Sequence, residues 1–280
     1  MNAVSGGKLQ LSGGMVCGLS EEFSKKMKEE REQIFLELMA SPYMHVDFTF
    51  GRVNGKQGTV MVCVSEGRVL YQGKEKKGHG GVKGSPAEFY EGTMIHDHES
   101  TFQSYGKKHQ ECLVHVERYL RSSIENEPGL EWNKKMLEWI KEAIHYRNIV
   151  VEGVEEKREK TEELQKRYGE ILEKAKEEYE YEPPGEYFKD GYKLYKRMSE
   201  DREAYLLFLK DMTIPPTNNA AENAARKYKR KNAQVMCFRS EEGRDYFCDG
   251  LSIMESMKAA DENVYEGVLG RFGQTTGTVS

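Results

Sequence analysis

The sequence predicts an α/β protein in which a mixed sheet flanked by helices is interrupted by a long all-helical insertion. From Tyr43 onward, apolar side chains alternate with a period of two through three short runs. Further short runs then alternate with helical segments, which gives the order β-β-β-α-β-α-β-α. Between Leu130 and Met212 the apolar spacing changes to the 3.6-residue period of helices. This change of period is the main sign of an insertion.

The first half contains the predicted sheet. Ser20 precedes two glutamates and begins a helix that is expected to run to about Ala40. Asn54-Gly55 is a strong hairpin signal, because a type I′ turn needs positive φ at both positions. The predicted strands are 43–50, 59–64, 68–71, 93–96 and 111–114. A short helix is expected to start at 85–88, another near 100–105, and a third to follow the last strand through Leu120.

The second half is predicted to be helical. Helices are expected at 130–147, 154–180 and 186–212, and after Pro215-Pro216 at about 219–229 and 240–260. The predicted organisation is an N-terminal segment with one helix (1–40), the first part of the core (41–122), the helical insertion (123–213), the final part of the core with a basic helix (214–266), and a flexible tail (267–280).

The composition is that of a soluble globular protein. Of its 280 residues, 38% are hydrophobic and 32% are charged, and no apolar run approaches the roughly 20 residues that cross a bilayer. We therefore expect no membrane partner. The five cysteines are odd in number and lack a C-x-x-C pair, which predicts reduced thiols in a cytoplasm.

The net charge of −5 is unevenly distributed. The segment Glu152–Glu182 alone contributes −5, whereas Arg226–Lys231 contributes +5 within six residues. A local surface for DNA therefore remains possible in an acidic protein.

Three carboxylates are candidates for chemistry. Asp47 lies in the middle of a predicted strand, on the face opposite Met44, Val46 and Phe48; the alternative is a simply solvated face. Asp97 ends a short apolar strand, where α/β sheets often place functional groups, or it caps the helix that follows.

Glu222 begins the basic helix and has two interpretations. With Asn219 as the N-cap, Glu222 would be at position N3 of a capping box, and Arg226 could be its i,i+4 partner. Together with Asp47 and Asp97, it could instead bind divalent magnesium, which prefers hard oxygen ligands. Two such ions would suit displacement at phosphorus, with the basic helix holding the DNA backbone.

Several sequence blocks resemble insertion-sequence-66 family transposases. They are PPTNNAAENAAR at 215–226, Arg230-Lys231-Asn232, FRSEEG at 238–243, HVDFTFGRVNGKQ and MIHDHESTFQSYG around the two aspartates, and HQECLVHVERYL at 109–120. The resemblance covers roughly 41–267. It implies an RNase H-like core and an Asp-Asp-Glu triad of Asp47, Asp97 and Glu222 that acts as catalyst and metal ligand set.

The resemblance also implies cofactors and partners. Two Mg²⁺ ions are expected, with Mn²⁺ as a possible substitute. The partner would be double-stranded DNA, both element ends and target, with self-association on DNA, accessory proteins of the same element and a nucleoid location. The expected DNA contacts are Asn218, Asn219, Arg226, Lys227, Lys229, Arg230 and Lys231.

The sequence departs from the family in two respects. Asn223 and Ala225 stand where members usually carry arginine and leucine, which affects one expected DNA contact. Only about forty residues precede Ser41, fewer than the usual N-terminal DNA-binding region. Recognition of element ends is therefore not assigned to this chain, and a truncated, non-catalytic DNA-binding remnant stays open beside a plain RNase H-like nuclease.

Three smaller features have a structural explanation as well as a functional one. Cys112 and His115 could suggest zinc, but a structural pair is favoured because no second ligand pair is visible. His96 and His98 flank Asp97 and are expected to support it rather than to bind metal. The lysines of the loop after the third strand, at 74, 76, 77 and 83, could follow phosphates or simply be solvated.

Overall fold

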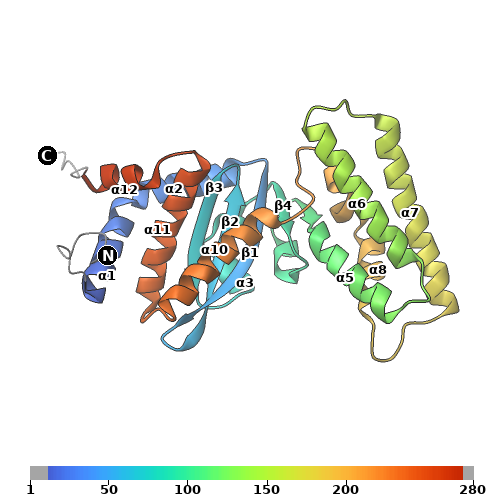
Figure 1. The fold of residues 1–280 in the computed structure, drawn as a ribbon, viewed down its shortest axis with the longest axis horizontal. Helices are drawn as coiled ribbons and strands as arrows, with labels where there is room; N and C mark the ends of the chain where they lie inside the picture. Colours follow the sequence, from blue (N-terminus) through green and yellow to red (C-terminus); the bar gives the residue numbers. More distant parts are fainter. Residues whose placement is uncertain (1–11, 274–280) are drawn as a thin grey trace. The chain divides into compact units, whose positions relative to one another are not determined.

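A computed structural model describes residues 12–273 of the chain as a mixed α/β protein (Figure 1). The chain forms two compact units. Among the described residues, one unit consists of 12–92 together with 219–273, and the other is Thr93–Asn218. No helix within 12–273 is long and apolar enough to cross a membrane. All five cysteines are free thiols, and burial raises the pKa of Cys63 to about 12.

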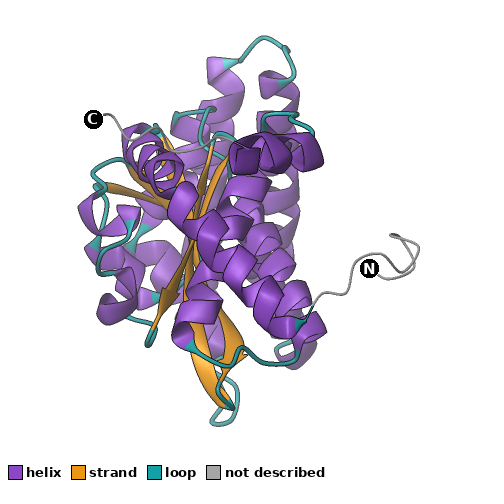
Figure 2. Cartoon of the chain, turned by 90° about the vertical axis from the view of Figure 1, so that its left-hand side faces the viewer, coloured by secondary structure: helices purple, strands orange, loops and turns teal. Residues whose placement is uncertain are grey.

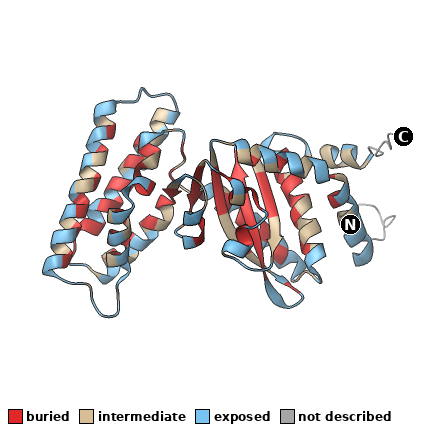
Figure 3. Cartoon of the chain, turned by 180° about the vertical axis from the view of Figure 1, so that it is seen from behind, coloured by how far each residue is buried: buried red, intermediate tan, exposed pale blue. Residues whose placement is uncertain are grey.

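The first unit contains an antiparallel sheet of β1 (Tyr43–Val53), β2 (Lys56–Ser65) and β3 (Arg68–Lys74). The β1–β2 turn has φ of 48° at Asn54 and 74° at Gly55, as predicted for this hairpin. Large parts of β1 and β2 are buried (Figure 3). Consecutive residues are buried in both strands, so both faces of the sheet are covered.

Helices surround this sheet. On one face, residues of α10 (Asn219–Val235) and α11 (Glu241–Ala259) share a hydrophobic cluster with Val60, Val62 and Tyr71. On the other face, the backbone of Gly81 lies against the ring of Phe48. Figure 2 shows these helices beside the orange strands. The remaining helices of this unit are α1 (Gly13–Lys26), α2 (Lys28–Ala40), α3 (His79–Val82), α4 (Pro86–Phe89) and α12 (Val264–Gly273).

Helix α11 also covers the outer edge of β3. The backbone N–H of Val69 donates to the hydroxyl of Ser256 at 3.2 Å, and that of Tyr71 donates to Ser252 at 2.9 Å. These two serines lie one helical turn apart, and strand N–H groups that point to the same edge recur every second residue. The edge donors therefore have partners within the unit, which prevents them from pairing with another strand.

The second unit combines a parallel strand pair with helices. β4 (Thr93–His96) pairs with β5 (Lys108–Glu111), with the 3₁₀-helix η1 (Ser100–Ser104) between them. The α-helices are α5 (Leu113–Asn126), α6 (Trp132–Val151), α7 (Arg158–Tyr181), α8 (Asp190–Glu200) and α9 (Arg202–Lys210). Trp132, Trp139 and Tyr168 are fully buried in their common core. The prediction that Leu130–Met212 is helical is confirmed.

Several predicted elements have different bounds in the structure. The helix expected at 20–40 is two helices, α1 and α2, which meet at Met27, where ψ of 13° departs from helical geometry. The helix expected at 186–212 is also divided, at Asp201. Part of the segment predicted as a flexible tail is helical, since α12 reaches Gly273; residues 274–280 lie outside the described part.

The strand expected at 111–114 lies three residues earlier, as β5. The N–H of Cys112 donates to the carbonyl of His96 at 2.9 Å, and α5 begins directly after it. The apolar residues Leu113, Val116 and Leu120 then follow the helical spacing and are buried. An apolar run this short fits both the period of a strand and that of a helix, so the sequence pattern alone does not decide between them.

Candidate functional site

Asp47 lies in the middle of β1, opposite Val62 of β2. Its neighbours on the same face, His45 and Thr49, are 4% and 0% exposed. Asp47 itself is partly exposed. The face is therefore not simply solvated, because both neighbours of Asp47 on it are buried. A carboxylate on such a face needs polar or cationic partners.

Helix α10 covers the Asp47 face of the sheet. A Cβ at Gly51 would lie 2.7 Å from the Tyr228 hydroxyl, so strand and helix approach too closely there for a larger residue. At the same end, the N–H of Arg52 donates to the side-chain oxygen of Asn232 at 3.3 Å. Nearer the start of the helix, the Tyr71 hydroxyl donates to the carbonyl of Ala224 at 3.0 Å.

These contacts fix the direction of α10 relative to β1. Tyr71 pairs with Val62, which pairs with Asp47, so Ala224 marks the level of Asp47 on the sheet. Asn232 marks the level of Arg52. Ala224 precedes Asn232 in the helix as Asp47 precedes Arg52 in the strand, so the two elements run in the same direction. The distances agree roughly, since eight helical residues span about 12 Å and five strand residues about 16 Å. The first turn of α10, which carries Glu222, therefore lies at about the level of Asp47.

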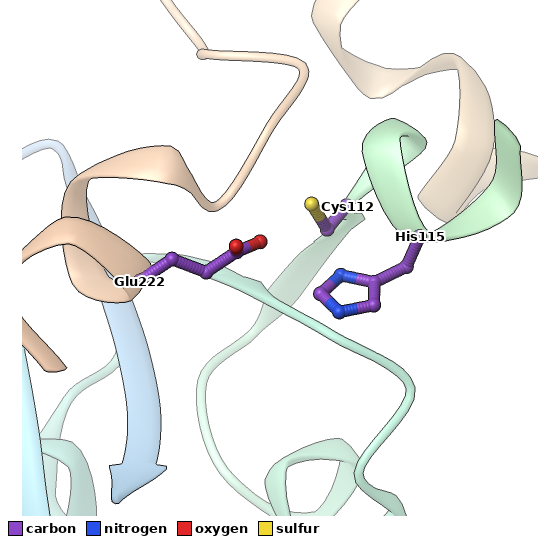
Figure 4. Close-up of side chains that lie close together, drawn as sticks. All are labelled: Cys112, His115 and Glu222. Atoms are coloured by element: carbon purple, nitrogen blue, oxygen red, sulfur yellow. The ribbon is translucent and has the colours of Figure 1, made fainter. Parts of the chain in front are cut away.

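The Glu222 side chain is only 12% exposed. Its carboxylate accepts a hydrogen bond from the Arg226 guanidinium at 3.0 Å, which confirms the expected i,i+4 partner. The helix begins at Asn219, so Glu222 is its fourth residue and Asn218 precedes the helix. The capping box expected with Asn219 as N-cap is thus one residue out of register. Figure 4 shows Glu222 projecting from the start of α10.

Asp97 directly follows β4 in the other unit. Its Oδ1 atom is buried and has no hydrogen-bond partner in the part of the chain that the structure describes. Burial raises the pKa of this carboxyl, an effect that His115 and His96 oppose. A buried carboxylate oxygen without a partner is costly, so it marks a place where a cation would be favourable.

The histidines around Asp97 are engaged with other side chains. The ring nitrogens Nε2 of His96 and Nδ1 of His109 are 3.0 Å apart, and His98 Nδ1 is 3.1 Å from the Glu111 carboxylate. Burial lowers the pKa of His109, which favours a neutral ring in this pair. These contacts fix the loop that carries Asp97, as expected for residues that support a carboxylate.

Cys112 and His115 lie one turn apart at the start of α5 (Figure 4). Cys112 is fully buried, and its sulfur accepts a hydrogen bond from the backbone N–H of Asn218 at 3.1 Å. His115 Nε2 accepts from the Arg118 guanidinium at 3.3 Å. Such contacts support the structural role predicted for the pair, with Cys112 joining the start of α5 to the end of the helical segment.

The basic residues of α10 are exposed, but they differ in their partners. Arg226 pairs with Glu222, and Lys227 pairs with the buried carboxylate of Glu255. Lys229, Arg230 and Lys231 form no ion pair within the described chain. Asn218 is only 1% exposed, whereas Asn219 is on the surface. At the end of β3, Lys74 donates to the Lys83 carbonyl at 2.6 Å, so its ammonium already has a partner.

The spacing along α10 places part of this charge beside Glu222. Residues four and seven to eight positions after Glu222 lie on the same helical face, and these are Arg226, Lys229 and Arg230. One stripe thus leads from a carboxylate level with Asp47 to unpaired cations. Clustered cations of this kind are typical of surfaces that contact the phosphates of nucleic acids.

Comparison with protein families gives a more particular identity. Residues 2–246 match the family described as Transposase IS66 family. The match covers most of the 280 residues, so the chain belongs to this family of transposases. No curated protein and no solved structure matches it. The family predicted from the blocks around Asp47, Asp97 and Glu222 is confirmed.

Proposed function

We propose that this chain is a metal-dependent DNA transposase that cleaves phosphodiester bonds at element ends and joins the freed 3′-hydroxyl to target DNA. Membership of the transposase family supports DNA as the partner and transposition as the process. The observation that carries the mechanism is the buried, unpartnered oxygen of Asp97, because a carboxylate of this kind is suited to a cation.

We propose Asp47, Asp97 and Glu222 as the Asp-Asp-Glu triad and as the ligands of two Mg²⁺ ions, with Mn²⁺ as a substitute. Their donor set fits, since all three supply the hard oxygens that magnesium prefers. The level of Glu222 beside Asp47, and the unpartnered Asp97 oxygen, support this assignment. Bound magnesium would neutralise charge on the attacking and leaving oxygens of an in-line displacement.

The other residues of α10 would position the DNA. Lys229, Arg230 and Lys231 would contact backbone phosphates, and Arg226 would hold Glu222 in place through their 3.0 Å contact. Asn219 and Lys227 complete the proposed exposed surface. Phosphate contacts fix the register of the duplex without reading its sequence, so recognition of element ends would need further contacts.

We propose that the parts of the chain serve this function in sequence order. An RNase H-like core would be formed by 41–122 and 214–266, interrupted by the helical insertion 123–213, with 1–40 as an N-terminal segment and 267–280 as a tail. In this scheme the carboxylates come from the core alone. Self-association on DNA, accessory proteins of the same element and a nucleoid location complete the proposal.

The decisive experiment is Glu222→Gln. We expect magnesium-dependent cleavage of a DNA substrate to fall about a thousandfold, which corresponds to about 4 kcal/mol of transition-state stabilisation. The matched control is Glu170→Gln in α7, which removes the same charge from another i,i+4 pair, with Lys166. Thermal melting should show that both variants fold.

The outcome separates the three candidate functions. Retained cleavage in Glu222→Gln would overturn the proposed triad. Cleavage by the native chain without joining of pre-cleaved ends to a target would indicate an RNase H-like nuclease. Binding of DNA without any magnesium-dependent cleavage would indicate a non-catalytic remnant.

A further inference from the structure

A second basic surface lies in the helical unit, on α8 and α5, far along the chain from α10. Helix α8 packs against α5 (Figure 1), and the two helices line a groove of about 640 Å³. The side chains that characterise this groove are Tyr119 from α5 and Tyr192, Lys193, Lys196 and Arg197 from α8. All belong to Thr93–Asn218, so the groove is complete within one unit.

Three cationic residues line the groove, but only one carboxylate does, that of Asp190. Lys193 pairs with Asp190 at 3.5 Å, but both side chains are more than half exposed, so the pair is weak. Lys196 and Arg197 form no ion pair with any residue that the structure describes. The Nε atom of Arg197 is buried and lacks a hydrogen-bond acceptor among the same residues. That buried atom is closed to a ligand, but the excess of cations over carboxylates gives the groove a positive charge, which favours an anionic ligand.

Each of these two cations lies over an aromatic ring. The Arg197 guanidinium carbon is 5.2 Å from the centre of the Tyr119 ring, and Lys196 Nζ is 5.6 Å from that of Tyr192. Tyr119 is 38% exposed, so part of its ring remains open to a ligand. Alternating rings and cations match the alternation of bases and phosphates in an unpaired strand, where bases stack and phosphates pair with the cations.

We propose that this groove binds single-stranded DNA. A duplex keeps its bases stacked on one another, so tyrosine rings would add nothing to phosphate contacts; an unpaired strand offers both groups. The proposal extends the proposed function, since cleavage at an element end can expose unpaired nucleotides. It rests on DNA as the partner, but it does not depend on the three carboxylates.

The test is binding of a fluorescein-labelled oligothymidine, followed by anisotropy in EDTA. Without metal, a failure of the catalytic triad cannot affect the result. Tyr119→Ala should weaken binding about tenfold, within the range of one base-stacking contact, whereas Tyr119→Phe should retain it. Lys196→Gln combined with Arg197→Gln should weaken binding further. A duplex of the same length should bind the native chain and Tyr119→Ala equally.

The matched control is Lys166→Gln combined with Lys176→Gln, which removes two charges from α7. Thermal melting should show that every variant folds, as expected for partly exposed side chains. Equal losses in the control and the α8 variant would overturn the proposal, because the effect would be one of net charge. Equal losses on duplex and single strand for Tyr119→Ala, or no loss at all, would also overturn it.

Discussion

Helices α7 and α10 are both densely charged, but they differ in how their cations are paired. Every cation of α7 has a carboxylate partner; the six are Arg158, Lys160, Lys166, Arg167, Lys174 and Lys176. In α10, by contrast, three consecutive cations from Lys229 to Lys231 form no ion pair within the described residues. Paired surface charges keep a helix solvated, whereas unpaired ones create a field that can attract an anion.

The comparison separates charge that serves the fold from charge that is available to a partner. Charge density alone does not distinguish them, since both helices would be marked as charged runs in a sequence. The partners distinguish them, and partners depend on spacing and packing. In α10, the two cations nearest the start of the helix are held by Glu222 and Glu255, which leaves the later three available.

The largest effect expected from this contrast is on duplex DNA binding. Replacing Lys229, Arg230 and Lys231 with Gln should weaken binding strongly and lower the slope of log affinity against log salt by about three, one per phosphate contact. The charge-matched control replaces Lys166, Lys174 and Lys176 in α7. Titrations at several salt concentrations measure both. Similar losses for the two triple variants would show that the pairing of charges does not matter.

Much of the sheet could be predicted from sequence because its turns are local. Positive φ at Asn54, Gly55 and Gly67 follows from residue type, whereas the φ of 42° at Glu66 does not. The two turns set the register of β1, β2 and β3. The short strand before Asp97 was also correctly placed. The 3.6-residue period likewise predicted a helical segment, although not the break at Asp201.

The features that define the site could not be predicted in this way, because they depend on distant parts of the chain. The cover of the Asp47 face by α10 rests on contacts such as Tyr228 with Gly51, which are 177 positions apart in the sequence. The unpartnered oxygen of Asp97 is a property of packing. The groove on α8 had a weak signal, Lys196-Arg197 following a tyrosine-rich stretch, but its second ring comes from α5.

A smaller effect is expected on thermal stability at Asp97, whose buried carboxylate oxygen has no partner among the described residues. Burial raises the pKa of Asp97, so at neutral pH its ionised form opposes folding. Asp97→Asn should therefore raise the melting temperature without metal, by about 2–4 °C for each kcal/mol recovered. The gain should disappear as the pH falls below about 3.9, the usual pKa of an aspartate, because both states of the native residue are then protonated.

Magnesium should reverse the order of the two melting temperatures, so that the native chain becomes more stable than Asp97→Asn. The native chain should gain about 2.7 kcal/mol at a hundredfold excess of magnesium over its dissociation constant, while Asp97→Asn should gain much less. Differential scanning fluorimetry with and without magnesium measures both. The control is Asp261→Asn, an exposed position with φ of 57° that asparagine also tolerates. A destabilised Asp97→Asn without metal would mean that the carboxylate has a structural partner.

The smallest effect should come from breaking a single pair on α7. Lys166 and Glu170 are 3.5 Å apart, and their side chains are 78% and 60% exposed, so water already screens the attraction. Lys166→Gln should lower the free energy of unfolding by less than about 0.5 kcal/mol. Urea denaturation should show this difference shrinking at 1 M salt, where the screening length is about 3 Å. DNA affinity should stay unchanged, since removing Lys166 takes away a cation that Glu170 already neutralises. A clear loss of duplex binding in this variant would show that paired cations on α7 also contact DNA, and the distinction between the two helices would fail.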